Sequence, residues 1–398
     1  MNYTEPARKP LVLGVLFGLL SALGPLAIDF YLPAFPAVAQ DLATNPAMVK
    51  LSLSLFFLAL ALGPVIYGTL SDRLGRRPLL FWAMGIFVLT SLACSAAPSI
   101  RWLLLGRFLQ GLGASGMTTI SRAMIRDLAR GHKAVQLLAF AFLVQGVSPI
   151  LAPVAGGLSL TFMSWRGLFL VMCGMTLIAA LLVYFVLPET HEQHQRVESR
   201  NVNILSIYRA VLGNRRFVLM SLIAGCSSGG TFTYLTGSPF LFAHVFHQPP
   251  THFSVMIAIA AGTYIAGIQG CPHLVKRFGI DRHLSWTTLA ATILALLLTA
   301  VALLGMANLA VFMSFLILLS TCFGLMVTPA AIGGMDAVKA HGGTAAAVLA
   351  TIQLLCATIA SATISVLPEG SVLPIAATML VCVVLATAAI RICPPSQH

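Results

Sequence analysis

The stretch GTLSDRLGRRP at residues 68–78 decides the fold. It stands between two apolar runs, at about 48–70 and 78–97, each of which is long enough to cross a bilayer. A glycine turn lets two helices approach closely, and its acid can meet an arginine or a helix N-terminus. A positive-inside turn would explain the arginines, but not the spacing of the whole stretch. The sequence therefore predicts a gating turn, whose candidate residues are Gly68, Asp72, Arg73, Gly75, Arg76 and Arg77.

Composition extends this prediction to the whole chain. Of its 398 residues 58% are hydrophobic and 9% are charged, whereas a soluble chain carries roughly 25% charged residues. Twelve apolar runs of spanning length follow one another, at about 11–36, 48–70, 78–97, 101–121, 134–160, 166–187, 217–241, 252–274, 284–305, 308–332, 343–366 and 371–392. We predict an all-α integral membrane protein with twelve transmembrane helices in two six-helix halves.

The charge distribution predicts the orientation. The net charge is +12, yet the basic residues form short groups between apolar runs rather than an aromatic-interleaved stripe, so we expect no nucleic-acid partner. With the N-terminus inside, 19 of the 23 basic residues fall on the cytoplasmic side. Both termini are therefore expected in the cytoplasm, and the lipid bilayer is an expected partner. The eight cysteines lie singly and do not form a disulfide or zinc framework.

A long polar stretch divides the chain into similar parts. We expect an N-terminal half at 1–190, a cytoplasmic linker at 191–216 and a C-terminal half at 217–398. The linker has modest helical periodicity, which fits either an amphipathic helix on the membrane surface or a plain connection. The turn at 272–282 repeats the Leu, Arg, apolar, Gly order of the first turn without its acid, as in parallel-repeat transporters.

The fourth span carries an arginine within its apolar run. Arg107 is expensive in a membrane unless it is paired or wetted, so it is a candidate functional residue, with snorkelling to the outer face as the alternative. Gln110 and Gly111 follow it. The glycines from 111 to 116 satisfy GxGxxG, but no strand precedes them and no acid lies about 20 residues on. We expect close helix packing rather than dinucleotide binding.

Two further spans carry candidate residues. In the first, Asp29 is the other intramembrane charge, and a carboxyl group in a low dielectric favours its protonated form. The alternative is a helix-end anchor among the headgroups, because two prolines follow. In the fifth, Pro153, Gly156 and Gly157 predict a bent, closely packed helix, with an ordinary kinked span as the alternative.

These motifs resemble the major facilitator superfamily. The turn at 68–78 matches its pattern between helices 2 and 3, and the fifth span resembles its antiporter motif, with Ala152 where glycine usually precedes the proline. The stretch DFYLPAFP at 29–36 resembles the Bcr/CflA, or bicyclomycin-resistance, drug efflux branch. Further matches are RAMIRDL at 122–128, WRGLF at 165–169, PET at 188–190 and FTYLTGSPF at 232–240.

The resemblance implies a bacterial inner-membrane carrier that exports drug-like compounds in exchange for protons by alternating access. It needs no cofactor beyond the proton gradient. Proton coupling would fall to Asp29 and Arg107, with Arg107 favouring the ionised acid when the two approach. Substrate contacts would come from Asp29, Phe30, Tyr31, Gln110 and Tyr234. We expect a monomer, because the GxxxG pairs more naturally pack internal helices.

Other functions are weighed against this one. The nearest is a proton-coupled symporter for a nutrient or metabolite, which the fifth-span motif argues against. A sensor or an enzyme lacks support, since no catalytic constellation and no sizeable soluble domain occur, and a channel lacks a filter element. The histidines 244, 247 and 252 cluster without a cysteine or carboxylate, so no metal site is expected. The sequence does not name the exported compounds.

Overall fold

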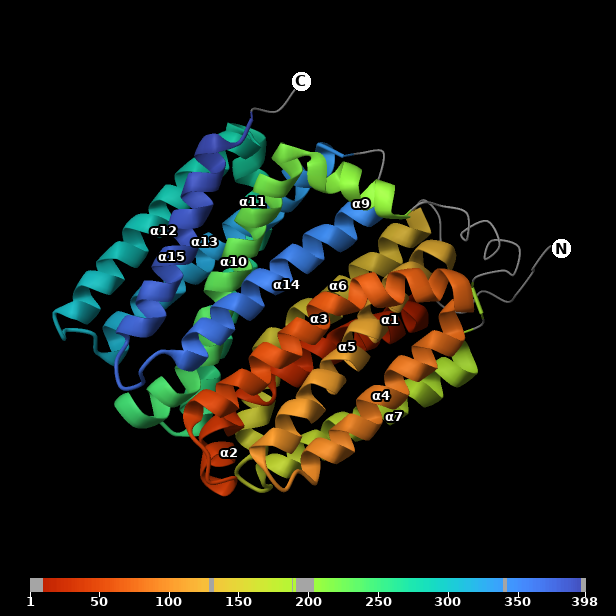
Figure 1. The fold of residues 1–398 in the computed structure, drawn as a ribbon, viewed down its shortest axis with the longest axis horizontal. Coiled ribbons are helices and arrows are strands. Elements are labelled where there is room, and N and C mark those ends of the chain that lie inside the picture. Colours follow the sequence, from red (N-terminus) through yellow and green to blue (C-terminus); the bar gives the residue numbers. More distant parts are fainter. Residues whose placement is uncertain (1–9, 129–131, 188, 191–203, 339–341, 395–398) are drawn as a thin grey trace.

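Two bundles of long helices make up the molecule (Figure 1). The computed structural model describes residues 10–128, 132–187, 189–190, 204–338 and 342–394, and that part of the chain contains twelve long helices. Those of the first bundle are α1 (Pro10–Asp29), α3 (Pro46–Leu74), α4 (Arg76–Ser95), α5 (Ile100–Leu128), α6 (His132–Ser159) and α7 (Trp165–Val186). Those of the second are α10 (Arg215–Phe240), α11 (Pro250–Phe278), α12 (Ile280–Leu303), α13 (Leu309–Asp336), α14 (Gly342–Val366) and α15 (Leu373–Ile392). The predicted fold class is confirmed.

The two halves repeat one another closely at their second and third helices. Helices α3 and α11 each have 29 residues, and their bounds are offset by 204 residues. Each ends at a single glycine, Gly75 with φ 99° and Gly279 with φ 77°, after which the next helix starts at once. Only glycine adopts this left-handed backbone without strain, so the glycines permit the one-residue turns.

Hydropathy alone recovers most of the spans. Ten helices of the described chain are long and apolar enough to cross a membrane, and Leu143–Ser159 in α6 forms a shorter apolar stretch. Helix α5 is not among the ten helices that meet this criterion. It carries polar and charged residues along its length, Arg107 and Gln110 among them. The sequence prediction of a span at 101–121 agrees with the bounds of this helix, Ile100–Leu128.

The first span is not the continuous helix that its apolar run at 11–36 suggested. Helix α1 ends at Asp29, a 3₁₀ turn covers Leu32–Ala34, and a short helix α2 covers Phe35–Asp41. The prolines at 33 and 36 have no N–H to continue the α1 hydrogen-bond ladder. The far end of α2 is held by Asp41, which accepts a hydrogen bond from Trp165 Nε1 at 3.1 Å and pairs with Arg166.

The halves meet along two seams. Helix α3 packs against α14 in the middle of the molecule, and α6 packs against α11 (Figure 1). Each seam joins one helix of each half, as expected for two bundles that can move as bodies. We call the end of the molecule with Gly75 and Gly279 the basic face, after the arginines around these turns, and the end with Asp41 the opposite face.

Side chains of neighbouring helices donate hydrogen bonds to two backbone carbonyls that prolines leave without a helical partner. Pro64 deprives the Leu60 carbonyl of its partner, and the Ser115 hydroxyl of α5 donates to that oxygen at 3.1 Å. Pro329 does the same to the Leu325 carbonyl, and Nε2 of the buried His283 of α12 donates to it at 3.0 Å. Because orphaned carbonyls are costly in a membrane, these two side chains fix where the helices bend.

The predicted linker is described only in part. Residues 191–203 lie outside the described chain, and helix α9 follows at Ile204–Gly213. Within it Val211 is buried, Leu212 is exposed, and the helix contacts α10 and α14. Whether its exposed side rests on the membrane surface stays a prediction.

Candidate functional site

Arg107 lies in the interior of the first half. Its side chain has no exposed surface, which excludes snorkelling to the outer face. Nη2 donates to the Ala27 carbonyl at 3.1 Å and Nη1 to Oε1 of Gln110 at 2.6 Å. The Ala27 carbonyl belongs to the last turn of α1, where carbonyls lack helical partners and carry partial negative charge. The guanidinium therefore caps the end of the helix that carries Asp29.

Aromatic rings surround this guanidinium. Its carbon lies 4.2 Å from the centroid of Phe56, 4.8 Å from that of Tyr31 and 5.8 Å from that of Phe169. No carboxylate pairs with it among the described residues, and its Nε has no hydrogen-bond partner there. The cation is thus stabilised by ring faces, one carbonyl and one amide, which leaves it available to an acid that approaches.

Gln110 and Tyr31 are built into the same environment. Gln110 donates from Nε2 to Ser91 Oγ at 2.8 Å, and the Tyr31 hydroxyl lies 3.4 Å from Ser52 Oγ. Both side chains are fully buried within the first half. In this arrangement they position Arg107, and neither presents a surface to a ligand.

Asp29, the last residue of α1, lies apart from that cluster. Its side chain is 6% exposed, and no hydrogen bond or ion pair of its carboxylate occurs in the described part of the chain. Such burial does not suit an anchor among hydrated headgroups. Tyr234 of α10 lies within electrostatic range of Asp29 and of Tyr264 on α11. The acid therefore lies near one tyrosine of the other half, Tyr234, and Tyr264 lies beyond it.

The glycines of α6 join these parts. A Cβ at Gly156 would lie 2.3 Å from the carbonyl oxygen of Phe30, the residue after Asp29. A Cβ at Gly157 would lie 2.2 Å from Ser254 Oγ and 3.0 Å from the Pro250 carbonyl oxygen, both on α11. Gly156 thus packs against the segment after Asp29, and Gly157 packs against α11 of the other half. Pro153 is buried one turn earlier in the same helix.

The turn at 68–78 is held within the first half. Glu189 accepts hydrogen bonds from the backbone N–H groups of Arg76 at 3.0 Å and Arg77 at 3.2 Å, where α4 begins. Arg76 Nε also pairs with Asp127 at the end of α5, at 3.0 Å. A carboxylate at a helix N-terminus is favoured by the helix dipole. Three loops of the basic face are fastened together in this way.

The remaining residues of this turn make fewer contacts. Arg73 is exposed, and a Cβ at Gly68 would meet nothing within 4 Å, so close approach of another helix does not require this glycine in the present arrangement. The side chain of Asp72 lies outside the described part of the chain.

The glycines of the fourth span serve packing. A Cβ at Gly111 would lie 2.6 Å from the Phe56 carbonyl oxygen on α3, and one at Gly113 would lie 2.8 Å from the backbone of α4. The expectation of close helix packing is confirmed, and these positions leave no room for a dinucleotide. Within the described residues no group of histidine, cysteine or acid could hold a metal ion.

Sequence reasoning missed contacts that only the fold creates. Lys50 of α3 forms an ion pair with Glu369, in the loop between α14 and α15, at 2.6 Å. A lysine at the start of an apolar run and a lone acid in the loop between the last two spans were the available signals. Tyr264 gave no signal, because a single tyrosine in an apolar run is an ordinary core residue.

Comparison with known proteins identifies the fold and its relatives. The family model of the Major Facilitator Superfamily matches residues 16–361. A Bacillus subtilis protein named Uncharacterized MFS-type transporter YdgK is 32% identical over 386 residues, which cover 96% of this chain and 95% of that protein. The Bicyclomycin resistance protein homolog of Haemophilus influenzae is 29% identical over 304 residues, 75% of this chain and 76% of that one.

Solved structures with the same fold are more distant in sequence. A bacterial homolog to the human lysosomal transporter Spinster, in an inward-facing and unoccupied conformation, has a TM-score of 0.74 at 15% identity and covers 98% of each chain. A D-xylose–proton symporter has a TM-score of 0.70 at 16% identity and covers 95% of each chain.

Proposed function

Because this chain belongs to the Major Facilitator Superfamily and is a multi-pass membrane transporter, we propose that it exports small drug-like compounds in exchange for protons. The observation that carries the proposal is the placement of Asp29. This buried acid ends the helix that Arg107 caps, lies near Tyr234 of the other half, and is followed by a backbone that packs on Gly156 of α6. The relative named for bicyclomycin resistance supports drug-like cargo.

The orientation follows from charge. We place the basic face in the cytoplasm, with both termini, because the turns at Gly75 and Gly279 and the start of α10 carry half of the described arginines. The relatives are bacterial, which favours the inner membrane. The opposite face, with Asp41 and Glu369, is then the outer face. One chain contains both halves, so a monomer suffices.

The transport cycle needs one group that exchanges a proton for cargo. Asp29 takes a proton when it is open to the outer side and releases it on the cytoplasmic side, and cargo competes with the proton for the same site. Arg107 keeps the first half ready for the ionised acid, because its charge has no carboxylate partner among the described residues. Tyr234 and Phe30 are buried in the present arrangement, and we expect them to offer aromatic surface to the cargo when the halves move apart. The proton gradient drives the cycle and no cofactor takes part.

A proton-coupled symporter of nutrients is the alternative, since a D-xylose–proton symporter has the same fold. The paired glycines of α6, which match the antiporter motif, favour antiport. The two functions differ in the direction of cargo relative to protons, so a direct measurement separates them.

The test uses inside-out membrane vesicles with an acidic interior, to which amphiphilic antibiotics and dyes are added. Antiport predicts that some compound collapses the gradient with the wild type and with Asp41→Asn, and that Asp29→Asn abolishes this effect. Asp41 is the matched control, because it is the other acid of the same segment but is exposed and held by Trp165 and Arg166. If Asp29→Asn retains the full response, or if only an inward-moving metabolite carries protons, the proposal fails.

A further inference from the structure

The seam between α3 and α14 is polar in its outer part. Ser54 Oγ lies 2.7 Å from Ser361 Oγ of α14, and Thr236 Oγ1 of α10 lies 2.9 Å from the same hydroxyl. One turn further in, the rings of Phe57 and Phe232 have centroids 4.3 Å apart. The Ser54–Ser361 and Phe57–Phe232 contacts lie below the Lys50–Glu369 ion pair on the same face of α3, and both join the two halves. The Thr236 contact lies within the second half and holds the Ser361 hydroxyl from behind.

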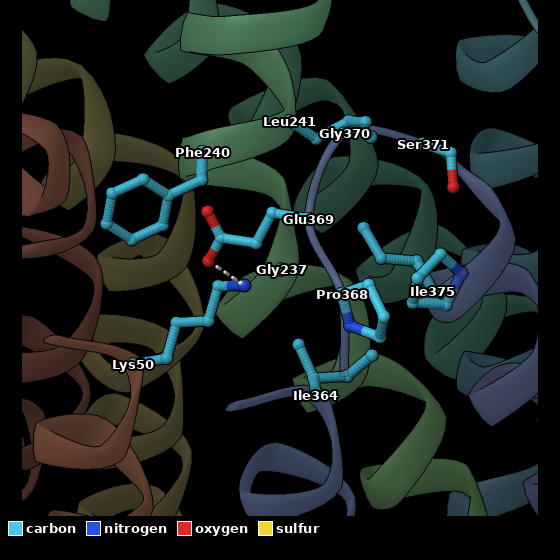
Figure 2. A pocket seen from close by; sticks show the side chains of 11 residues that line it. Lys50, Gly237, Phe240, Leu241, Ile364, Pro368, Glu369, Gly370, Ser371 and Ile375 are labelled. Carbon is cyan, nitrogen blue, oxygen red and sulfur yellow. Dashed lines mark ion pairs between the residues drawn. The ribbon is translucent and has the colours of Figure 1, made fainter. Parts of the chain in front are cut away.

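Lys50 stands at the outer end of this row. Its side chain is 4% exposed although it carries a full charge, and Nζ lies 2.6 Å from Glu369 Oε1 and 5.5 Å from the centroid of Phe240 (Figure 2). Lys50 belongs to the first half, whereas Glu369 and Phe240 belong to the second. A buried amine whose partners all belong to the other half loses them when the halves separate.

The same face of α3 is open toward the cytoplasm. Ala61 still accepts a hydrogen bond from Thr351 at 3.3 Å. One turn later Val65 is exposed, and a Cβ at Gly68 would meet nothing within 4 Å. Contacts between the halves therefore gather at the outer two-thirds of α3, and the molecule is closed at its outer face.

We propose that Lys50 and Glu369 form the charge lock of the outer gate, which must break each time the transporter opens outward. The proposal rests on the proposed alternating transport but not on the identity of the cargo. A buried ion pair contributes little net stability, because its attraction is offset by the lost hydration of both charges. When the gate opens, water returns to both groups. Each charge thus needs the other in the closed state, and the pair does not make the opening step prohibitive.

The geometry predicts unequal effects of removing each partner. Glu369→Gln leaves the buried Lys50 charge without a counter-charge, which strongly disfavours the closed state. Lys50→Met leaves Glu369, whose side chain is 28% exposed and already partly hydrated. The double variant removes both charges and lets Met fill the space, so it should close again.

The experiment measures the outer gate directly. Nitroxide labels are placed on Phe162→Cys and Met306→Cys, which lie in exposed outer loops of different halves, in a background without the eight native cysteines. Double electron–electron resonance then gives the ratio of outward-open to outward-closed molecules, with neither cargo nor a proton gradient present. This ratio can shift even if the cargo proposal fails.

Glu369→Gln is expected to raise the ratio of open to closed molecules about tenfold, or about 1.4 kcal/mol. Lys50→Met should raise it about threefold, and this second variant gives a result even if Glu369→Gln does not fold. The double variant should return within about twofold of the wild type. Asp41→Asn, which breaks an outer-face ion pair inside one half, is the control and should not change it. An unchanged ratio in both single variants, or a double variant as open as Glu369→Gln, would overturn the proposal.

Discussion

A single methyl group at Gly157 is expected to open the outer gate. In Gly157→Ala the new Cβ would lie 2.2 Å from Ser254 Oγ and 3.0 Å from the Pro250 carbonyl oxygen. Ordinary contacts of this kind are more than 3 Å long, so α6 and α11 must separate by about 1 Å at this level. Ser254 Oγ also donates to the Pro250 carbonyl at 2.7 Å, and turning it away would break that bond.

Overpacking of this kind costs about 1 to 3 kcal/mol. Because the contact exists only while the outer face is closed, the cost falls on the closed state, and the ratio of open to closed molecules should rise roughly 5- to 150-fold. The labels at Phe162→Cys and Met306→Cys measure this ratio.

Gly146→Ala is the matched control for this substitution. Gly146 lies in the same helix, and a Cβ there would meet nothing within 4 Å, so it reports the general effect of alanine on α6. The double variant Gly157→Ala/Ser254→Ala removes the closest contact and should recover part of the shift. If Gly157→Ala and Gly146→Ala give the same distance distribution, the α6–α11 contact does not hold the gate.

The remaining predictions concern buried polar groups. Ser115→Ala and His283→Phe each leave a backbone carbonyl next to a proline without its hydrogen bond, so each should lower the free energy of unfolding by about 1 to 3 kcal/mol. The control Thr118→Ala removes only a hydrogen bond within its own helix and should lower the free energy of unfolding less. Thermal unfolding in detergent measures these differences. Arg107→Lys keeps the charge, but a lysine cannot contact the Ala27 carbonyl, Gln110 and three aromatic rings at once. The variant should therefore fold yet lose most of the drug-dependent proton flux in vesicles. Proton flux equal to that of the wild type would contradict the capping role of Arg107.

The membrane-spanning helices could be predicted from the sequence because each can be recognised from its own residues alone. A helix in a bilayer satisfies its own backbone, so length and apolarity locate it without reference to other parts of the chain. The exception was the first span, where the apolar run continued past Asp29 although prolines ended the helix. Hydropathy does not report that a proline lacks a backbone N–H, and so the apolar run at 11–36 predicted a longer helix than α1.

The polar interior was only half predictable. Arg107 and Asp29 stood out because charges are rare in spans, but the partners of Arg107 were not the expected acid. Ser54 and Ser361 are separated by 307 residues and are ordinary helix residues, so neither carries a local signal. Their pairing follows from the packing of α3 on α14, which a single sequence does not encode in any short pattern.

The distribution of charge assigns different tasks to the two halves. Asp29, Arg107 and Lys50 all belong to the first half, while the second half places Tyr234 near Asp29 and Glu369 against Lys50. The paired glycines of α6 connect these tasks, since Gly156 holds the backbone after Asp29 and Gly157 holds α11. Protonation changes the charge of Asp29 and hence how strongly α1 is drawn toward Arg107. Any resulting shift at Phe30 reaches the α6–α11 seam through one peptide unit, and we expect this short path to couple the proton site to the outer gate.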